Sequence, residues 1–323
     1  MLRKLLTTTA LILSLHTSGR ASSLLVSYTT ASGGGGIERY SLTPQSAGTT
    51  FDTETTPVTS LTAVNNTAYW ATGTRIFSDS LTDPAAGAGK TLLSTIPFAG
   101  FSISDLAVDP ITNTYLVGWI APGLGWFVVQ YPLAPNSDFT IFSNDTAPIQ
   151  GLTVVGNTAY WTEGSGIFSE HLDGTGKSQI QSFNFGAVTL NDLAVDPASQ
   201  TYFLAAATSG LPPLIARYPL TLNSSGTLFA FANSNINALT IAGDQAYWID
   251  GMSIWSENLN GTGLTLQETL PSQLTPTDLA VSLDPMVAAP EPATWTLLGI
   301  ALLLCGTGHR RSVACPLSIK NQN

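Results

Sequence analysis

The stretch PTDLAVSLDP, residues 276–285, begins a repeat that stops after a single strand-like segment. The same unit occurs twice before it as DLAVDP, at residues 105–110 and 192–197, and both earlier copies continue into a full repeat. The first repeat of the chain begins at Ser23 and lacks this segment. Together the two partial units make one complete unit, which predicts that the polypeptide closes on itself as a ring.

Two kinds of segment alternate along the body of the chain. One kind aligns without gaps over 14 residues and begins with Ala-Tyr-Trp, in the copies 68–81, 159–172 and 246–259. The other aligns without gaps over 20 residues, in the copies 23–42, 114–133 and 201–220. The aspartates that open the DLAV segments are 87 and 86 residues apart, so each period holds two units of about 43 residues.

Within each unit, runs of β-branched and aromatic residues alternate with Gly, Asn, Asp and Pro, which predicts four short strands joined by turns. In the unit that begins at Gly151 the runs are LTVV, AYWT, IFSEHL and KSQIQSF. Four strands in 40–45 residues is the size of a propeller blade. We therefore expect residues 22–285 to form an all-β, six-bladed β-propeller of four-stranded antiparallel blades. We expect its C-terminal strand, 278–283, to pair beside residues 24–28, because an open ring would leave bare strand edges.

A resemblance to a known repeat supports the same fold. The segment AYWTEGSGIFSEHLDGTGK, residues 159–177, resembles the YWTD repeat, and the propellers of that family have six blades. Where the family has Thr-Asp, this chain has Ala71-Thr72, Thr162-Glu163 and Ile249-Asp250. The resemblance therefore implies the fold and is not extended to the receptor function of that family.

Charge and residue types exclude several classes of function. The chain has 323 residues, 11 Lys and Arg, 21 Asp and Glu, and a net charge of −10. Only five basic residues lie between Ser22 and Pro285, so we expect no nucleic-acid partner, which would need a basic surface. Cys305 and Cys315 lie in the C-terminal tail, and His171 is the only internal histidine, which we expect to be solvated. A thiolate nucleophile and a multi-histidine metal site are therefore excluded from the body.

Residues 1–21 have the pattern of a secretory signal peptide. Arg3 and Lys4 form a basic start, residues 5–15 form a short apolar run, and the sequence Gly-Arg-Ala favours cleavage after Ala21. An uncleaved anchor is the alternative, although the run is shorter than the roughly 20 residues of a spanning helix.

Residues 286–323 resemble a linker followed by the PEP-CTERM sorting signal of Gram-negative bacteria. The residues that carry the resemblance are, in order, Pro290, Glu291 and Pro292, the apolar run from Trp295 to Leu304, and then Arg310 and Arg311. An apolar transmembrane run before two arginines would stay in the inner membrane with its end in the cytoplasm. The resemblance implies removal of this tail by an exosortase-type enzyme. It also implies a final location at the cell surface or outer membrane, or in the extracellular matrix.

The twelve residues after the two arginines depart from the usual pattern, in which the tail ends there. A plain C-terminal anchor is the alternative.

Three aspartates form the first candidate site. Asp105, Asp192 and Asp278 occupy equivalent positions at the start of the first strand of alternate blades. Because the first strand of a propeller blade lines the central channel, we expect a ring of three carboxylates at one mouth of it. Such a ring could hold Ca²⁺ or another polar ligand. The alternative is that each aspartate caps a local turn. The matching positions on the other blades are Ser60, Gly151 and Ala238.

Tryptophans form the second candidate. Trp70, Trp161 and Trp248 are expected on second strands, where they either pack between blades or offer a platform for sugar stacking. Trp119 and Trp126 lie in a less regular region and are the better candidates for contact with a carbohydrate.

These observations favour a secreted, non-enzymatic binding or matrix module associated with the cell surface, exopolysaccharide or biofilm, with polysaccharide or surface proteins as partners. The alternative is a calcium-dependent hydrolase or lactonase at the central channel, because six-bladed propellers also host such sites. That chemistry needs unlike ligands, including Glu and Asn, whereas the expected ring has three equivalent aspartates. A purely structural spacer is the third reading, and fold alone does not decide among them.

Overall fold

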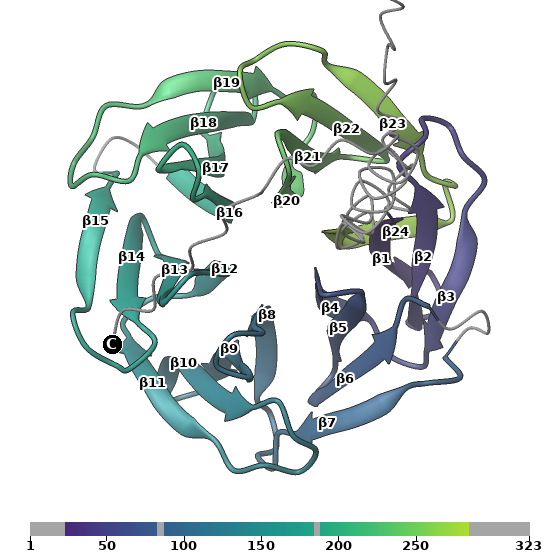
Figure 1. Ribbon diagram of the computed structural model, residues 1–323, viewed down its shortest axis with the longest axis vertical. Helices are drawn as coiled ribbons and strands as arrows, with labels where there is room; N and C mark the ends of the chain where they lie inside the picture. Colours follow the sequence, from purple (N-terminus) through teal and green to yellow (C-terminus); the bar gives the residue numbers. More distant parts are fainter. Residues whose placement is uncertain (1–22, 83–86, 184–187, 284–323) are drawn as a thin grey trace, which may run out of the picture. The chain divides into compact units, whose positions relative to one another are not determined.

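A computed structural model describes residues 23–82, 87–183 and 188–283 of the chain. These residues form six four-stranded antiparallel sheets around a central channel, as Figure 1 shows. The predicted all-β, six-bladed propeller is therefore confirmed. The predicted signal peptide, the Pro290–Pro292 motif, the apolar run and the two arginines lie outside the described residues.

Blades I, III and V carry the DLAV segment on their innermost strand. Blade I consists of β24 (Leu274–Ser282), β1 (Ser23–Thr30), β2 (Gly35–Ser41) and β3 (Thr49–Glu54). Blade III consists of β8 (Ser102–Asp109), β9 (Thr114–Ala121), β10 (Gly125–Pro132) and β11 (Thr140–Asp145). Blade V consists of β16 (Val188–Asp196), β17 (Thr201–Thr208), β18 (Leu214–Pro219) and β19 (Thr227–Phe231).

Blades II, IV and VI carry the Ala-Tyr-Trp segment on their second strand. Blade II consists of β4 (Val58–Val64), β5 (Thr67–Thr72), β6 (Arg75–Ser80) and β7 (Thr91–Thr95). Blade IV consists of β12 (Ile149–Val155), β13 (Thr158–Glu163), β14 (Gly166–His171) and β15 (Ser178–Ser182). Blade VI consists of β20 (Ile236–Ala242), β21 (Gln245–Asp250), β22 (Ser253–Asn258) and β23 (Thr265–Thr269).

The ring closes inside blade I, where the last strand pairs with the first. Strand β24 runs antiparallel to β1, with Val26 opposite Leu279 and Leu24 opposite Val281. The hydroxyls of Ser27 and Thr277 lie 2.8 Å apart across this junction. The closure predicted from the incomplete repeat at residues 276–285 is therefore confirmed. It removes the two strand edges that an open ring would expose.

The six innermost strands share one pattern of layers along the channel. Each has a leucine at the same position, 2–6% exposed and packed between blades, in the set Leu61, Leu106, Leu152, Leu193, Leu239 and Leu279. Because side chains alternate between the two faces of a strand, the next residue points toward the other neighbouring blade, where Ala107, Ala194 and Ala280 belong to the inter-blade cores. It is small in every blade, in the set Thr62, Ala107, Thr153, Ala194, Thr240 and Ala280.

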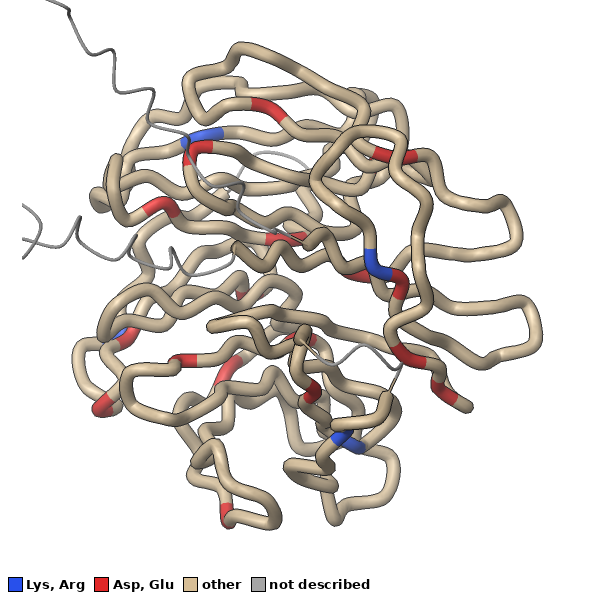
Figure 2. Tube along the Cα trace, turned by 45° about the vertical axis from the view of Figure 1, so that its right-hand side comes forward, with Lys and Arg blue, Asp and Glu red and all other residues tan. Residues whose placement is uncertain are grey.

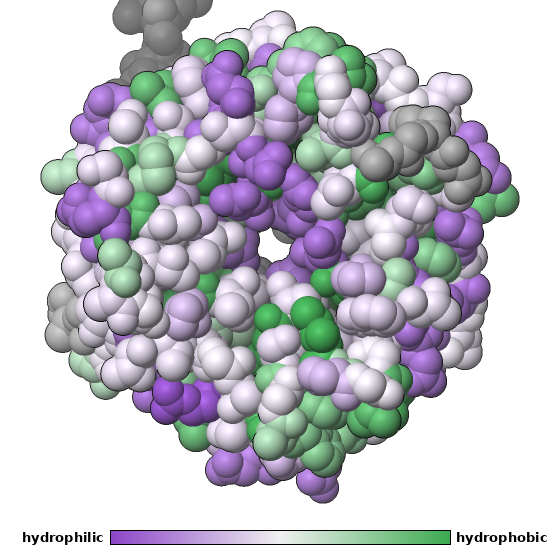
Figure 3. Space-filling view, turned by 180° about the vertical axis from the view of Figure 1, so that it is seen from behind, coloured by the Kyte–Doolittle hydropathy of each residue, from purple (hydrophilic) through white to green (hydrophobic). Residues whose placement is uncertain are grey.

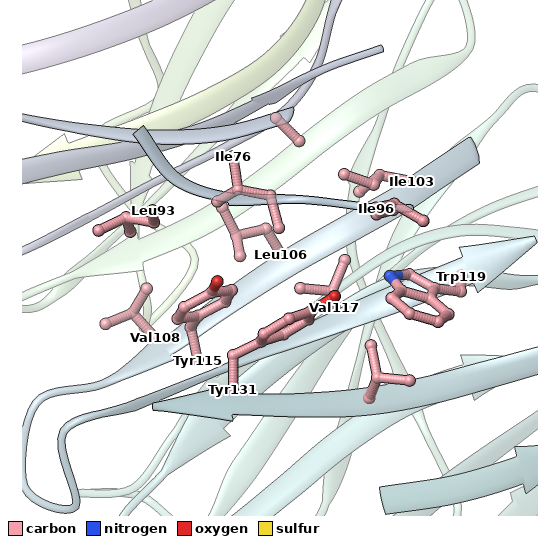
Figure 4. Packing of buried hydrophobic residues seen from close by; sticks show 12 residues of the cluster. Ile76, Leu93, Ile96, Ile103, Leu106, Val108, Tyr115, Val117, Trp119 and Tyr131 are labelled. Carbon is pink, nitrogen blue, oxygen red and sulfur yellow. The ribbon is translucent and has the colours of Figure 1, made fainter. Parts of the chain in front are cut away.

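The second strands supply the large aromatic residues of the inter-blade cores. The indoles of Trp70, Trp161 and Trp248 are almost completely buried. In blade III the rings of Tyr115 and Tyr131 stack with their centroids 4.9 Å apart, and Figure 4 shows them within the cluster between blades II and III. The three tryptophans therefore pack between blades, and the alternative of a sugar-stacking platform at these positions is wrong.

Basic side chains join neighbouring blades. Lys90 of blade II reaches to blade I, where its Nζ lies 2.9 Å from an oxygen of Asp52 and 2.5 Å from an oxygen of Glu54. Lys177 of blade IV reaches to blade III in the same way and lies 2.7 Å from Asp145. Figure 2 shows how few basic residues the described chain contains.

The two arginines of the 20-residue segments make a second kind of link. Arg39 of blade I donates to the carbonyl oxygen of Leu81 at 2.7 Å, and Arg217 of blade V donates to that of Leu259 at 2.9 Å. Leu264 stands where the other two junctions have Lys90 and Lys177, so at the junction of blades V and VI the basic link is that of Arg217 and no lysine is present at this position.

Candidate functional site

A β-bulge interrupts every innermost strand just before its leucine layer. In β8 the register with β9 shifts between Ile103 and Asp105, and in β16 the register with β17 shifts between Leu190 and Asp192. The other four innermost strands shift at the same layer. A bulge redirects side chains, and here it turns polar residues toward the axis of the ring.

At this layer the channel opens into a vestibule of about 570 Å³, which adjoins an inner channel of about 250 Å³. The vestibule volume is within the roughly 300–1,000 Å³ that is typical of small-ligand sites. Figure 3 shows this end of the channel, with hydrophilic side chains gathered around the opening.

Each innermost strand contributes one polar side chain to the wall of the vestibule. In their order around the ring, three adjacent strands contribute hydroxyls and the next three contribute carboxamides. The hydroxyl half consists of Thr277, Thr59 and Ser104. The carboxamide half consists of Gln150, Asn191 and Asn237, and Asn235 lies beside it.

Several of these carboxamides have no protein partner. The side chains of Gln150, Asn191 and Asn235 make no hydrogen bond to another residue of the described chain. Asn237 makes one long bond, in which its amide donates to the carbonyl oxygen of Pro276 at 3.4 Å. A carboxamide both donates and accepts, so this half of the wall offers free groups of both kinds.

The three aspartates lie beneath this wall and line both the vestibule and the inner channel. Each carboxylate accepts two backbone N–H groups, one from its own strand and one from the next blade. The pairs are Leu106 at 2.7 Å and Leu152 at 2.6 Å for Asp105, Leu193 and Leu239 both at 2.6 Å for Asp192, and Leu279 at 2.7 Å and Leu61 at 2.6 Å for Asp278.

The small residues that alternate with the aspartates leave room for these links. The Ser60 hydroxyl donates to Asp105 at 2.8 Å from the preceding blade. At Gly151 a Cβ atom would lie 2.6 Å from the Leu193 nitrogen and 2.9 Å from an oxygen of Asp192, so a side chain would displace the carboxylate. The alternation of aspartate and small residues therefore follows from the way each carboxylate spans two blades.

The three carboxylates resist ionisation. Burial raises the pKa of Asp105 to about 6, although the bonds from Ser60, Leu106 and Leu152 oppose the shift. Burial also raises the pKa of Asp192 and of Asp278 well above the usual value, and the charge of Asp105 raises both further. Near neutral pH the layer therefore carries less negative charge than three separate aspartates would.

The aspartates are neither free ligands nor simple turn caps. The sequence placed them at one mouth of the channel, and the structure places them deeper, between the vestibule and the inner channel. Within the described ranges, no group of three or more His, Cys, Asp and Glu is arranged to hold a metal ion. Because both oxygens of each carboxylate already accept N–H groups, the ring fits Ca²⁺ poorly, and binding at Asp105, Asp192 and Asp278 stays a prediction.

The carbohydrate role predicted for Trp119 is wrong. Its side chain is 3% exposed and is enclosed by Phe98, Phe101 and Phe139, with ring centroids 4.7–6.2 Å away. The aromatic side chains border an apolar groove of about 500 Å³ between blades II and III. Trp126 is partly buried against the core between blades III and IV.

His171 is exposed at the end of β14, as predicted.

Sequence reasoning missed the vestibule amides and the links between blades. Gln150 and Asn191 directly precede the positions of Gly151 and Asp192, so a comparison of that column across all six units would have shown a polar residue in each. Residues at the aspartate position of the YWTD pattern also join blades. Glu163 accepts the Thr146 N–H at 2.6 Å, and Asp250 accepts the Ser234 N–H at 2.7 Å.

Solved structures share this fold. The nidogen in a nidogen/laminin complex is similar to this chain, with a TM-score of 0.65 and 18% identity, over 81% of this chain and 98% of that one. TolB from Acinetobacter baumannii has a TM-score of 0.62 and 12% identity, over 82% of this chain and 66% of that one. A putative TolB from Agrobacterium tumefaciens has a TM-score of 0.59 and 10% identity, over 83% of this chain and 100% of that one.

At these identities the likeness concerns the fold alone. No known protein-family model matches the chain. No curated protein matches it either. In residues 23–82, 87–183 and 188–283 there is no helix with the length and apolar character needed to span a bilayer.

Proposed function

We propose that this protein is a non-enzymatic binding module that takes a polar ligand in the vestibule at one end of its channel. The observation that carries the proposal is the set of free carboxamides of Gln150, Asn191 and Asn235 on the wall of a 570 Å³ cavity. Gln150 and Asn235 are exposed and Asn191 is half-buried, so these amides are accessible from the cavity and available for a ligand. The nidogen neighbour was solved in complex with laminin, so a binding role has a precedent on this fold.

The groups near the axis support binding over catalysis. The three carboxylates are engaged by two backbone N–H groups each, so none is positioned as a free general base toward the vestibule. His171, the only internal histidine, is on the outer part of blade IV and does not line the channel. The calcium-dependent lactonase alternative would need one of these carboxylates to leave its backbone partners.

The cellular setting is part of the proposal. The signal-peptide pattern and the resemblance of Pro290–Pro292 and the following run to a PEP-CTERM signal favour export through the inner membrane. We propose processing by an exosortase-type enzyme and residence at the cell surface, in the outer membrane or in the extracellular matrix. Exopolysaccharide or surface proteins would then be the partners within reach.

A glycan array probed with the purified protein tests the function. We expect at least one glycan class to bind, and we expect Asn191→Ala to weaken that binding because it removes an unpartnered amide from the vestibule wall. Asn157→Ala is the matched control, since Asn157 lies on the turn at the opposite end of blade IV. Binding that both variants lower equally, or turnover of a lactone panel with calcium, would overturn the proposal.

A further inference from the structure

The chemistry of the vestibule wall suggests which ligands it can accept. Hydroxyls on one half and carboxamides on the other both donate and accept hydrogen bonds. A ligand with the same dual capacity at many points, such as the hydroxyl groups of a sugar, can pair with both halves in one orientation. A ligand with only acceptors would leave the amide oxygens of the carboxamide half without a donor.

Apolar side chains also line the vestibule, with Ile236 and Pro276 on blades VI and I and a further group near blade III. Ile120, Pro148 and Ile149 line the vestibule between β9 and β12. Figure 3 shows hydrophobic colour next to the opening on the side of blade III. A pyranose ring has hydroxyls at its edge and C–H groups on its faces, so a cavity that offers both polar and apolar side chains suits it.

The vestibule has no basic group to hold an anion. The structure describes all five basic residues of the body, and none of them lines the cavity. Lys90 and Lys177 are held by carboxylates, and Arg39 and Arg217 by backbone carbonyls of the next blade. Arg75 lies over the ring of Phe77 in blade II.

The layer beneath the wall adds negative charge at pH 7.5, because Asp105, with a pKa of about 6, is ionised there even though burial holds the pKa of Asp192 and Asp278 well above the usual value. An anionic ligand would lose its hydration against Asp105, Asp192 and Asp278 without gaining a cationic partner. Like charges placed together at an interface are strongly unfavourable. The affinity for a cationic ligand is lower than the charge alone suggests, because the carboxylate oxygens already accept N–H groups at 2.6–2.7 Å.

We infer that the vestibule accepts an uncharged sugar residue and rejects carboxylated or sulfated sugars. This inference rests on the proposed function and specifies its ligand class. The amides of Gln150 and Asn191 recognise the sugar hydroxyls, and the acidic layer below them supplies the selection against anions.

Two pairs of probes, each matched in backbone and different in charge, test the inference. Trigalacturonate and its fully methyl-esterified form share one backbone and differ in charge, and a glucosamine trimer and its N-acetylated form provide the cationic comparison. At pH 7.5 we expect the methyl-esterified form, or neutral glycans on an array, to bind at least about tenfold more tightly than trigalacturonate, and we expect the N-acetylated trimer to bind no more weakly than the free amine. We expect this discrimination to shrink at pH 5, where more of the aspartate layer is protonated.

A single substitution should reverse the preference. Gln150→Lys places a cation on the vestibule wall at an exposed amide without a protein partner, and we expect it to raise the affinity for the anionic probe about tenfold. Asn157→Lys, at the opposite end of blade IV, adds the same charge and should change nothing.

The outcomes separate the two proposals. Equal or tighter binding of the anionic probe by the natural protein overturns the inference on ligand class and leaves the binding function standing. A clear preference for the glucosamine trimer over its N-acetylated form also overturns the inference on ligand class, leaves the binding function standing, and indicates an ammonium ligand. If no glycan of any charge binds, the inference and the proposed function both fail.

Discussion

Replacing Asp105 by asparagine should affect the stability of the ring less favourably at low pH than at high pH. Asparagine keeps one oxygen to accept either Leu106 or Leu152, and it turns an NH₂ group toward the other backbone N–H. The unmatched donor lowers the free energy of unfolding by about 1–3 kcal/mol at any pH. The same substitution removes the ionisable group, and that effect depends on pH.

The ionisation effect has a definite sign. The pKa of Asp105 is raised by burial from 3.8 to about 6, so the folded protein holds this proton to a higher pH than the unfolded chain does. Below pH about 4 the carboxyl adds no penalty. As the pH rises from about 4 to about 6, the free energy of unfolding falls by about 3 kcal/mol in total, at 1.36 kcal/mol for each pKa unit, and about 1 kcal/mol of this is lost by pH 4.5. The Asp105→Asn variant is spared this loss because its amide does not ionise.

The two effects together predict that the variant gains about 2 kcal/mol relative to the natural protein between pH 4.5 and pH 8. Asp105→Asn should be less stable than the natural protein by up to about 2 kcal/mol at pH 4.5 and equal to it, or more stable by up to about 2 kcal/mol, at pH 8. Urea unfolding followed by tryptophan fluorescence at several pH values measures this difference. Leu106→Ala, a truncation in the same strand without a titratable group, should lose a similar amount at every pH.

A stability loss in Asp105→Asn that is the same at pH 4.5 and pH 8 would refute the reasoning. It would mean that Asp105 is ionised in the folded ring at both values, and that the backbone N–H groups outweigh its burial.

Three further predictions follow from the packing of the blades. Lys90→Leu should lower the free energy of unfolding by about 3 kcal/mol, because it leaves the buried carboxylates of Asp52 and Glu54 without a cation. Leu264→Lys, at the equivalent position between blades V and VI, should change the free energy of unfolding by less than about 1 kcal/mol. Equal effects of the two substitutions would contradict a stabilising role for the Lys90 ion pairs. Ending the chain before Leu274 removes β24 and should yield a protein that aggregates or melts at a far lower temperature than the full chain. Light scattering measures the aggregation and circular dichroism measures the melting temperature. An unchanged melting curve would argue against closure through blade I. Millimolar calcium should leave the melting temperature unchanged, because the carboxylate oxygens are already engaged, and a rise that Asp192→Asn abolishes would show that the ring binds the ion.

The repeat pattern determined the fold because each blade uses the same local rules. Strand length, turn residues and the buried tryptophans recur every two units, so six alignable units predicted six sheets and the incomplete units predicted the closing pair. The strands expected in the unit at Gly151 correspond to β12–β15, with boundaries that differ by a few residues.

The site was harder to predict because it depends on contacts between units. The sequence identified Asp105 and its two counterparts as equivalent, but nothing within one repeat indicates that their oxygens accept N–H groups from the next blade. The predicted carbohydrate contact of Trp119 was wrong for the same reason, since this side chain is buried by Phe98 and Phe101 in the connection before β8. The bulges, which turn Gln150 and Asn191 toward the axis, leave no clear sequence signal of their own.

The pairing of Ser23 with Ser282 gives the ring a single point of attachment. Both residues lie at the end of blade I opposite Leu274 and Thr275, and therefore on the face away from the vestibule. A tether or fusion partner joined directly at Ser23 or Ser282 would attach to the face opposite the vestibule and leave the vestibule unobstructed. Modifications at the two ends would also crowd one another, so a label added at one end is best tested with the other left bare.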